Sequence, residues 1–148
     1  TRNLINNNLL YGKILDYGCG YGYDYSYLLN LGLDISGYDK YNVVFNHNYL
    51  LRTHYDVVYA NYVFNTIPTL REHEDVVNQL RSIGDNVYIT LRNDTRSIKD
   101  NWEYIKEDDV YWNGRSYQRY YTELSISYYF GKVEYLYNNG SYIQFKLL

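Results

Sequence analysis

The segment that most constrains the fold is residues 14–24, which read ILDYGCGYGYD. A short apolar run ends in an acid and is followed by glycines at three alternating positions, Gly18, Gly20 and Gly22. Glycine permits tight turns and lets a ligand approach the main chain, because no Cβ stands in the way. Residues 23–31 then show helical spacing of apolar side chains, so the glycines lie between a strand and a helix. This order predicts a ligand-binding loop in an α/β fold.

The rest of the chain alternates between strand and helix patterns, which indicates a mostly parallel sheet. We expect strands at residues 13–17, 35–38, 55–60 and 86–91, and helices at 23–31 and about 70–83, the second with a capping box at Thr69 and Glu72. Two alternating runs, 133–137 and 142–147, flank an Asn-Gly pair and predict a C-terminal antiparallel hairpin. Residues 92–114 are polar and are expected to form a loop with a short helix.

One connection is unusually short. Only residues 40–54 separate the second predicted strand from the third. A crossover needs at least ten to twelve residues on its own. We therefore expect one crossover element of a doubly wound sheet to be reduced or missing.

Composition limits the remaining classes. The 148 residues predict a single domain spanning 1–148, and 23 tyrosines with many asparagines suggest an AT-rich genome, such as that of a phage, a virus or a low-GC bacterium. A net charge of −3 argues against a global basic surface for nucleic acid. One cysteine and no membrane-spanning run favour a cytoplasmic protein without a disulfide framework. The three dispersed histidines predict no metal site, and His73, beside charged neighbours, is expected to be exposed.

Asp39 is the second feature that points to a ligand. It ends the second predicted strand, 19 residues after Gly20. An acid at this position accepts hydrogen bonds from ribose hydroxyls in nucleoside-binding α/β folds. The helix behind the glycines favours an anion such as a carboxylate at its N-terminus. The spacing G-x-G-x-G, in place of G-x-G-x-x-G, argues against a dinucleotide pyrophosphate.

These motifs, ILDYGCGYGYD, SGYDKY and YDVVYANYVFNTIP, resemble in their order the signature of class I S-adenosylmethionine-dependent methyltransferases over about residues 12–94. The resemblance implies a Rossmann-like three-layer sandwich, a mostly parallel sheet with a C-terminal antiparallel hairpin, and S-adenosylmethionine as cofactor. The later segments YITLRND and GRSYQRYY also resemble a group of small phage and bacterial methyltransferase-like proteins. No equivalent of the family's adenine-contacting acid follows Asp39.

The resemblance also implies the site residues. The expected cofactor-binding residues are Asp16, Gly18, Cys19, Gly20, Gly22, Asp39, Lys40 and Asn61, with Cys19 as a small packing residue of the loop. Asn61, Tyr62 and Asn65 are expected at the methyl-transfer face as catalytic candidates, although Asn61 to Phe64 lacks both prolines of the N-P-P-Y motif.

The acceptor side is predicted from position and residue type. Arg92, Asp94, Tyr117 and Gln118 are the candidates, in a rim with Arg96, Arg115, Arg119, Tyr120 and Tyr121. Polar residues that follow a parallel strand lie at the edge where open α/β sheets bind ligands, and tyrosines can stack on planar groups. The alternative is a solvated loop with scattered charges.

The sequence is compatible with three functions. The first is an S-adenosylmethionine-dependent methyltransferase whose acceptor is a nucleic acid or a small molecule. The second is a non-catalytic S-adenosylmethionine-binding module that needs a partner. The third is a domain that binds another nucleoside, because the glycine loop and the acid do not detect sulfur. We expect no membrane partner, and the tyrosine-rich tail suggests a homodimer.

Overall fold

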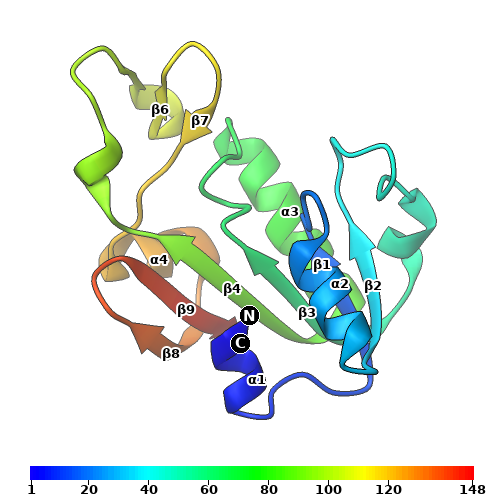
Figure 1. The fold of residues 1–148 in the computed structure, drawn as a ribbon. Helices are drawn as coiled ribbons and strands as arrows, with labels where there is room; N and C mark the ends of the chain where they lie inside the picture. The colour runs from blue at the N-terminus through cyan, green and yellow to red at the C-terminus, as the bar shows by residue number, and fades with distance from the viewer. The chain divides into compact units, whose positions relative to one another are not determined.

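The computed structural model describes residues 1–148, except for the side chain of Ser97. Its main sheet has six strands in the order β2-β1-β3-β4-β9-β8 (Figure 1). The strands are β1 (Lys13–Tyr17), β2 (Asp34–Tyr38), β3 (Tyr55–Asn61), β4 (Gly84–Arg92), β8 (Val133–Asn138) and β9 (Tyr142–Leu147). A small second sheet has the order β5-β6-β7, formed by β5 (Glu103–Ile105), β6 (Val110–Trp112) and β7 (Tyr117–Gln118).

The helices are α1 (Arg2–Asn6), α2 (Tyr23–Asn30), α3 (Leu70–Ile83) and α4 (Glu123–Phe130), with 3-10 turns η1 (Asn48–Arg52), η2 (Thr95–Ser97) and η3 (Lys106–Asp108). Within the described part of the chain, none of these helices is long and apolar enough to cross a membrane. The chain divides into two compact units, residues 1–61 with 79–88, and residues 62–78 with 89–148.

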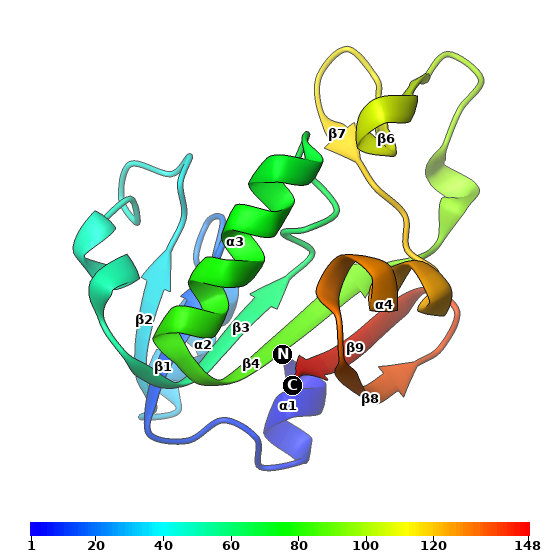
Figure 2. The same cartoon turned by 180° about the vertical axis from the view of Figure 1, so that it is seen from behind.

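The first unit is built on parallel pairing around β1. In register, Ile14 lies beside Ile35 of β2 on one side and Val57 of β3 on the other. The apolar run predicted as a buried strand is therefore central, and residues 14–17 are buried whereas Lys13 is exposed. Helix α2 lies over these strands in both views (Figures 1 and 2) and buries Leu28.

The short connection between β2 and β3 has the expected consequence. It contains only a loop and η1, so β2 is an edge strand of the sheet. The prediction of a mostly parallel sheet with a reduced crossover and an antiparallel C-terminal hairpin is confirmed.

The second unit shows where the sequence-based predictions were wrong. His73 is buried, not exposed, and its ring packs 4.8 Å from the rings of both Phe64 and Phe130. The segment predicted as a loop with a short helix contains two 3-10 turns, η2 and η3, and also two strands that were not predicted, β5 and β6. Helix α4 was not predicted; Thr122 and Ser125 cap its N-terminus reciprocally. Figure 2 shows α4 beside the β8–β9 hairpin. The ring centre of Phe130 lies 5.1 Å from that of Phe145 and 5.0 Å from that of Phe64.

Candidate functional site

The glycine loop of the first unit has the backbone that its sequence predicts. Gly18, Gly20 and Gly22 have φ angles of 73°, 56° and 76°, in the left-handed region that favours glycine. A Cβ on Gly22 would lie 2.5 Å from Cζ of Phe45, so packing excludes a side chain there. A Cβ on Gly20 would meet nothing within 4 Å. The Cα of Gly20 therefore faces open space, on the side where other residues carry a side chain.

Asp39 fastens the glycine loop to the segment that follows β2. Its Oδ2 accepts a hydrogen bond from the backbone N–H of Gly20 at 2.9 Å. Its Oδ1 accepts from the backbone N–H groups of Tyr41 at 2.8 Å and Asn42 at 3.0 Å. A carboxylate has about four acceptor positions, so three donors leave about one, at Oδ2, for a ligand hydroxyl.

Asn42 completes this connection from the other side. Its Nδ2 donates to the carbonyl of Gly20 at 2.7 Å, and its Oδ1 accepts from the N–H of Val44 at 3.0 Å. Both backbone groups of Gly20 are thus held by the segment after β2. Asn42 is not among the residues predicted from the sequence, because its only signal is its place in the short segment after the strand-end acid.

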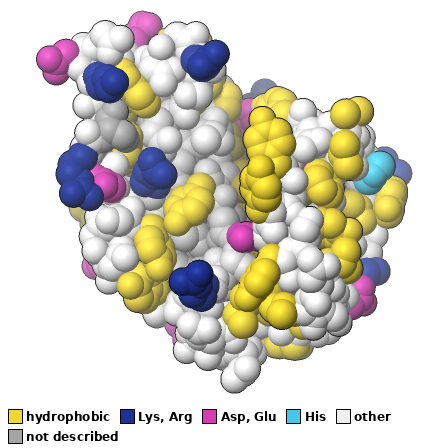
Figure 3. Space-filling model, in the orientation of Figure 1, with side chains coloured by type: hydrophobic (Ala, Val, Ile, Leu, Met, Phe, Trp, Pro, Cys, Tyr) yellow, Lys and Arg dark blue, Asp and Glu magenta, His cyan; other side chains and the backbone are white. Residues whose placement is uncertain are grey.

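A cavity of about 710 Å³ lies beside these contacts, within the first unit. Its lining is Gly20, Tyr21, Asp39, Tyr41, Asn42, Val43, Val44 and Phe45. Figure 3 shows hydrophobic side chains gathered on the surface near α2 and the segment after β2, and Tyr41 and Val43 are 83% and 88% exposed. An apolar cavity with one carboxylate at its wall is suited to a planar base joined to a sugar.

Asp16 is a buried acid without a complete set of partners. It is 3% exposed, and among the described residues neither its Oδ2 nor the hydroxyl of Tyr59 has a hydrogen-bond partner. Burial raises the pKa of Asp16 to about 7; the nearby Tyr59 hydroxyl lowers it, and the charge of Asp24 raises it further. A cationic group placed here would favour the carboxylate and reverse this shift.

Asp24, in the first turn of α2, carries a second polar cluster. It accepts hydrogen bonds from the hydroxyl of Thr1 and from Nδ2 of Asn61, the latter at 3.3 Å. The same Nδ2 donates to the Thr1 hydroxyl at 2.7 Å. Asn61 at the end of β3 thus meets the helix that follows the glycine loop. Asp24 is the last residue of the segment ILDYGCGYGYD, but no role was predicted for it from the sequence.

The other two residues expected to bind the cofactor are Cys19 and Lys40. Burial raises the pKa of the Cys19 thiol to about 12, with the charge of Asp16 adding to the shift, so the thiol stays protonated at neutral pH. Its Sγ would lie 3.2 Å from a Cβ on Gly37, which is a packing contact. Lys40 places its ammonium 5.4 Å from the ring centre of Tyr41.

Two of the three catalytic candidates lie in the second unit. Tyr62 follows β3, has a φ of 62° and is 44% exposed. Asn65 is 1% exposed; its Nδ2 donates to the carbonyls of Arg92 at 2.9 Å and Arg119 at 2.7 Å, and its Oδ1 accepts from the Arg92 N–H. These contacts make Asn65 a clamp between two backbone segments. Catalysis by Asn61, Tyr62 or Asn65 stays a prediction.

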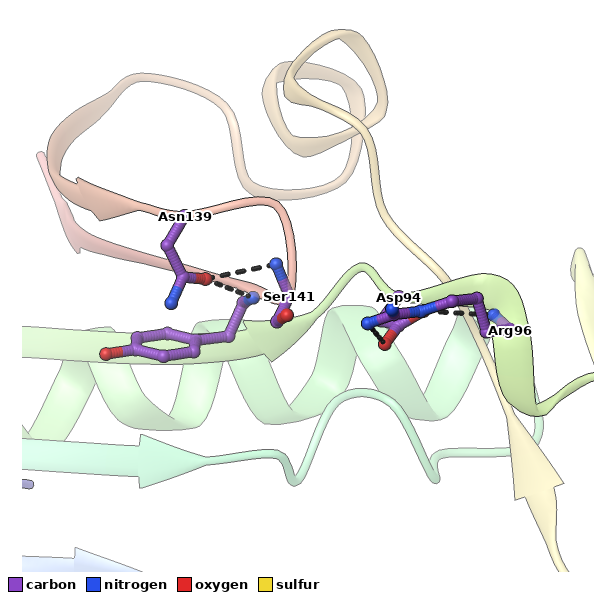
Figure 4. A network of polar contacts seen from close by, with 5 residues as sticks. Asp94, Arg96, Asn139 and Ser141 are labelled. Atoms are coloured by element: carbon purple, nitrogen blue, oxygen red, sulfur yellow. Dashed lines mark hydrogen bonds and ion pairs between the residues drawn. The ribbon is translucent and has the colours of Figure 1, made fainter.

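The residues predicted to bind the acceptor differ in their contacts and in their exposure. Asp94 caps η2 and pairs with Arg96, whose Nε and Nη2 donate to it at 2.8 Å and 2.6 Å (Figure 4). Tyr117 packs on Trp112, with ring centres 4.5 Å apart. Gln118 donates to the Arg119 carbonyl at 3.3 Å, and Arg92 is exposed at the end of β4.

Two members of the expected rim are not at the surface. Arg119 is 0% exposed, with Nε and Nη2 donating to the carbonyls of Asp109 and Asp108. Tyr121 is 2% exposed and donates to the Phe64 carbonyl at 3.0 Å. The expectation that both contribute to a surface rim is wrong, because each is needed inside the second unit to satisfy backbone carbonyls.

Comparison with known protein families shows to which family the chain belongs. The family described as a methyltransferase domain matches residues 3–131 of this chain. The chain belongs to this family. The predicted family is thereby confirmed for this methyltransferase, whereas the narrower phage and bacterial group stays a prediction.

Solved structures share the fold of this methyltransferase. An S-adenosylmethionine-dependent methyltransferase from Methanosarcina mazei has a TM-score of 0.73 at 15% identity, with 97% of each chain covered. One from Bacteroides fragilis, in complex with S-adenosylhomocysteine, has a TM-score of 0.64 at 15% identity, covering 100% of this chain and 76% of that one.

A third similar structure is the 1,6-didemethyltoxoflavin-N1-methyltransferase of Burkholderia thailandensis, with bound 1,6-didemethyltoxoflavin and S-adenosylhomocysteine. Its TM-score is 0.65 at 12% identity, covering 97% of this chain and 72% of that one. A search of curated proteins found no match.

Proposed function

We propose that this methyltransferase binds S-adenosylmethionine in its first unit and transfers the methyl group to a small-molecule acceptor. The observation that carries the cofactor assignment is the buried Asp16 oxygen without a partner beside an open glycine loop. The α-ammonium of the cofactor would supply the missing cationic partner. When bound, the cofactor supplies an electrophilic methyl group on a sulfonium.

The remaining roles follow from the contacts in the first unit. Asp39 accepts a ribose hydroxyl at the free position of Oδ2, and the open backbone of Gly20 lets the ligand approach. The cavity lined by Tyr41, Val43 and Val44 takes the adenine. Apolar contact in this cavity then replaces the adenine-contacting acid that the short segment after β2 lacks.

A small-molecule acceptor is supported by charge and by one structural neighbour. The net charge of −3 offers no broad basic surface, while binding of nucleic acid relies on several phosphate contacts. The Burkholderia enzyme of the same fold is described with a small heterocycle as its bound partner. We include residues 1–148 in one functional domain, because α3 and β4 each run through both units.

Calorimetric titration with S-adenosylmethionine and S-adenosylhomocysteine tests the cofactor assignment. Asp39→Asn should weaken both by at least about tenfold, because a tenfold change corresponds to about 1.4 kcal/mol and a charge-assisted hydrogen bond contributes that much. Asp34→Asn, an exposed acid at the start of β2, is the matched control and should bind as the wild type does. No binding to the wild type would overturn the proposal.

Catalysis needs a separate measurement. Transfer of a labelled methyl group from the cofactor into small-molecule and nucleic-acid pools should give labelled product only in the small-molecule pool. Cofactor binding without transfer to any pool would favour the non-catalytic module. Transfer into nucleic acid would overturn the small-molecule assignment and leave the cofactor site intact.

A further inference from the structure

The C-terminal hairpin of the second unit contains an irregularity that brings two tyrosines together. Tyr135 of β8 pairs with Phe145 of β9, but Tyr137 pairs with Gln144, so one residue is extra on β8. Such bulges re-aim side chains and are frequent next to active sites. After the shift, Tyr137 stacks on Tyr142 with ring centres 5.0 Å apart and planes at 26°. The result is a small aromatic platform at the start of β9.

The platform continues onto β4. Nε2 of Gln144 donates to Oγ1 of Thr90 at 2.9 Å, so these two side chains share one face of the sheet. Alternate residues of a strand lie on the same face. Arg92 lies two residues beyond Thr90, and Tyr142 lies two residues before Gln144, toward the same end of the two strands. These two residues are therefore the next pair on that face. Figure 3 shows hydrophobic and Lys or Arg side chains together over β9 and the end of β4.

The turn beneath the platform is held in place by hydrogen bonds. The N–H of Asn93 donates to the Ser141 carbonyl at 3.1 Å, which fits the same register. Oδ1 of Asn139 accepts from the N–H groups of Ser141 at 3.0 Å and Tyr142 at 3.1 Å (Figure 4). Rotamers and backbones fixed in this way lose little freedom when a ligand binds.

Tyr62 adds a third ring. Its N–H donates to the Thr90 carbonyl at 2.8 Å, which fixes it beside the same part of β4 in a left-handed conformation that bulky residues rarely adopt. Residues held in such conformations cluster at ligand sites. Tyr62 is 44% exposed and Tyr137 is 38% exposed, so both residues can contact a ligand.

From this arrangement we propose that the acceptor is a small planar aromatic acid, held by Tyr62, Tyr137, Tyr142 and Arg92. We call these four residues the tyrosine face. The rings offer stacking surfaces to a planar molecule. Arg92 offers a cation to a carboxylate or an ionised hydroxyl, while the nearby Asp94 is already neutralised by Arg96. One such cation fits a small anion better than a nucleic-acid backbone.

This inference rests on the proposed function, because it names the acceptor class of the same reaction. The test uses the full chain saturated with S-adenosylhomocysteine and the fluorescent planar acid 7-hydroxycoumarin-3-carboxylate as probe. We expect saturable binding to the wild type, followed by anisotropy. Tyr142→Leu and Arg92→Gln should each weaken it at least tenfold, whereas Tyr142→Phe, which keeps the ring, should stay within about threefold of the wild type.

Two controls distinguish loss of the tyrosine face from loss of cofactor binding. Tyr128→Leu removes a tyrosine that is 79% exposed on α4, outside the tyrosine face, and should bind the probe as the wild type does. Calorimetry of each variant with S-adenosylhomocysteine should give unchanged affinity. Failure of the cofactor to bind the wild type would overturn the proposed function. Cofactor binding with no probe binding, or with probe binding that ignores Tyr142→Leu and Arg92→Gln, would overturn the tyrosine face alone.

Discussion

The carboxylate of Asp39 and the backbone N–H of Gly20 are joined by a hydrogen bond of 2.9 Å. The acid at the end of β2 thereby fixes the glycine loop, together with which it is expected to bind the cofactor. Asn42 reinforces the link through its bond to the Gly20 carbonyl at 2.7 Å. The glycine loop is thus positioned before any ligand arrives, and the segment after β2 supports it in place of a longer crossover.

Asn42→Ala should loosen this support. Two side-chain hydrogen bonds are lost, so the free energy of unfolding should fall by about 1–2 kcal/mol. S-adenosylmethionine affinity should fall by roughly three- to tenfold, because the ligand must then order the loop. Urea denaturation and calorimetry measure the two effects. The control is Asn46→Ala, which removes one exposed bond to the Lys40 carbonyl and should leave affinity unchanged.

Gly20→Ala separates backbone strain from loss of ligand access. Gly20 and Gly32 have φ angles of 56° and 83°, and a Cβ on either meets nothing within 4 Å. Each alanine variant should therefore lose about 1–2 kcal/mol of stability through the left-handed backbone. Only Gly20→Ala should also weaken S-adenosylmethionine binding, by at least about tenfold, since its methyl group enters the cavity lining. Equal affinities in the two variants would contradict the assigned role of Gly20.

Residues with a strong local signal were predicted well. The glycines and Asp39 follow apolar strands, so their place at the sheet edge could be derived from pattern alone. The partners that complete the cavity were not predictable, because Phe45 reaches Gly22 only through a loop with no periodicity. Short polar strands such as β5 and β6 carry too few residues for an alternation to be recognised.

His73 shows how a signal can be present and still be missed. Its neighbours in sequence are charged, which suggested exposure. Along the helix, however, it precedes Val77 and Leu80 by four and seven residues, and these share one buried face. The helical period was therefore a better guide than the adjacent residues.

The pH dependence of cofactor affinity should report on Asp16. Its pKa is raised to about 7, so the carboxyl is mostly protonated at pH 5.5 and half ionised at pH 7. A cofactor ammonium, with an ordinary α-amino pKa of about 7.7–8.0, is protonated at both values. Binding of S-adenosylmethionine should thus be about tenfold weaker at pH 5.5 than at pH 7. Asp16→Asn should bind weakly at both values, and a wild-type dependence in that variant would exclude Asp16 as the ammonium partner.

His73 should make the second unit sensitive to acid. Burial, and then the charge of Arg119, lower the pKa of His73 to about 3. The unfolded chain binds a proton near pH 6.5, so the folded state is the one with fewer protons between pH 6.5 and about 3. The contribution of His73 to the free energy of unfolding is therefore complete above pH 6.5 and falls with the pH. His73 alone lowers the stability by about 2 kcal/mol between pH 7 and pH 5.

His73→Phe removes this proton site and keeps an aromatic ring among Phe64 and Phe130. Urea denaturation at pH 7 and pH 5 should show a change in unfolding free energy that is about 2 kcal/mol less favourable in the wild type than in the variant. Asp16 has a raised pKa in the folded chain, so it adds stability of similar size as the pH falls over this range, and it does so in both proteins. The difference between the two proteins therefore isolates His73. His47→Phe, at an exposed position, should retain the wild-type difference. Identical pH dependence in the wild type and His73→Phe would show that the buried ring is not the source of the acid sensitivity.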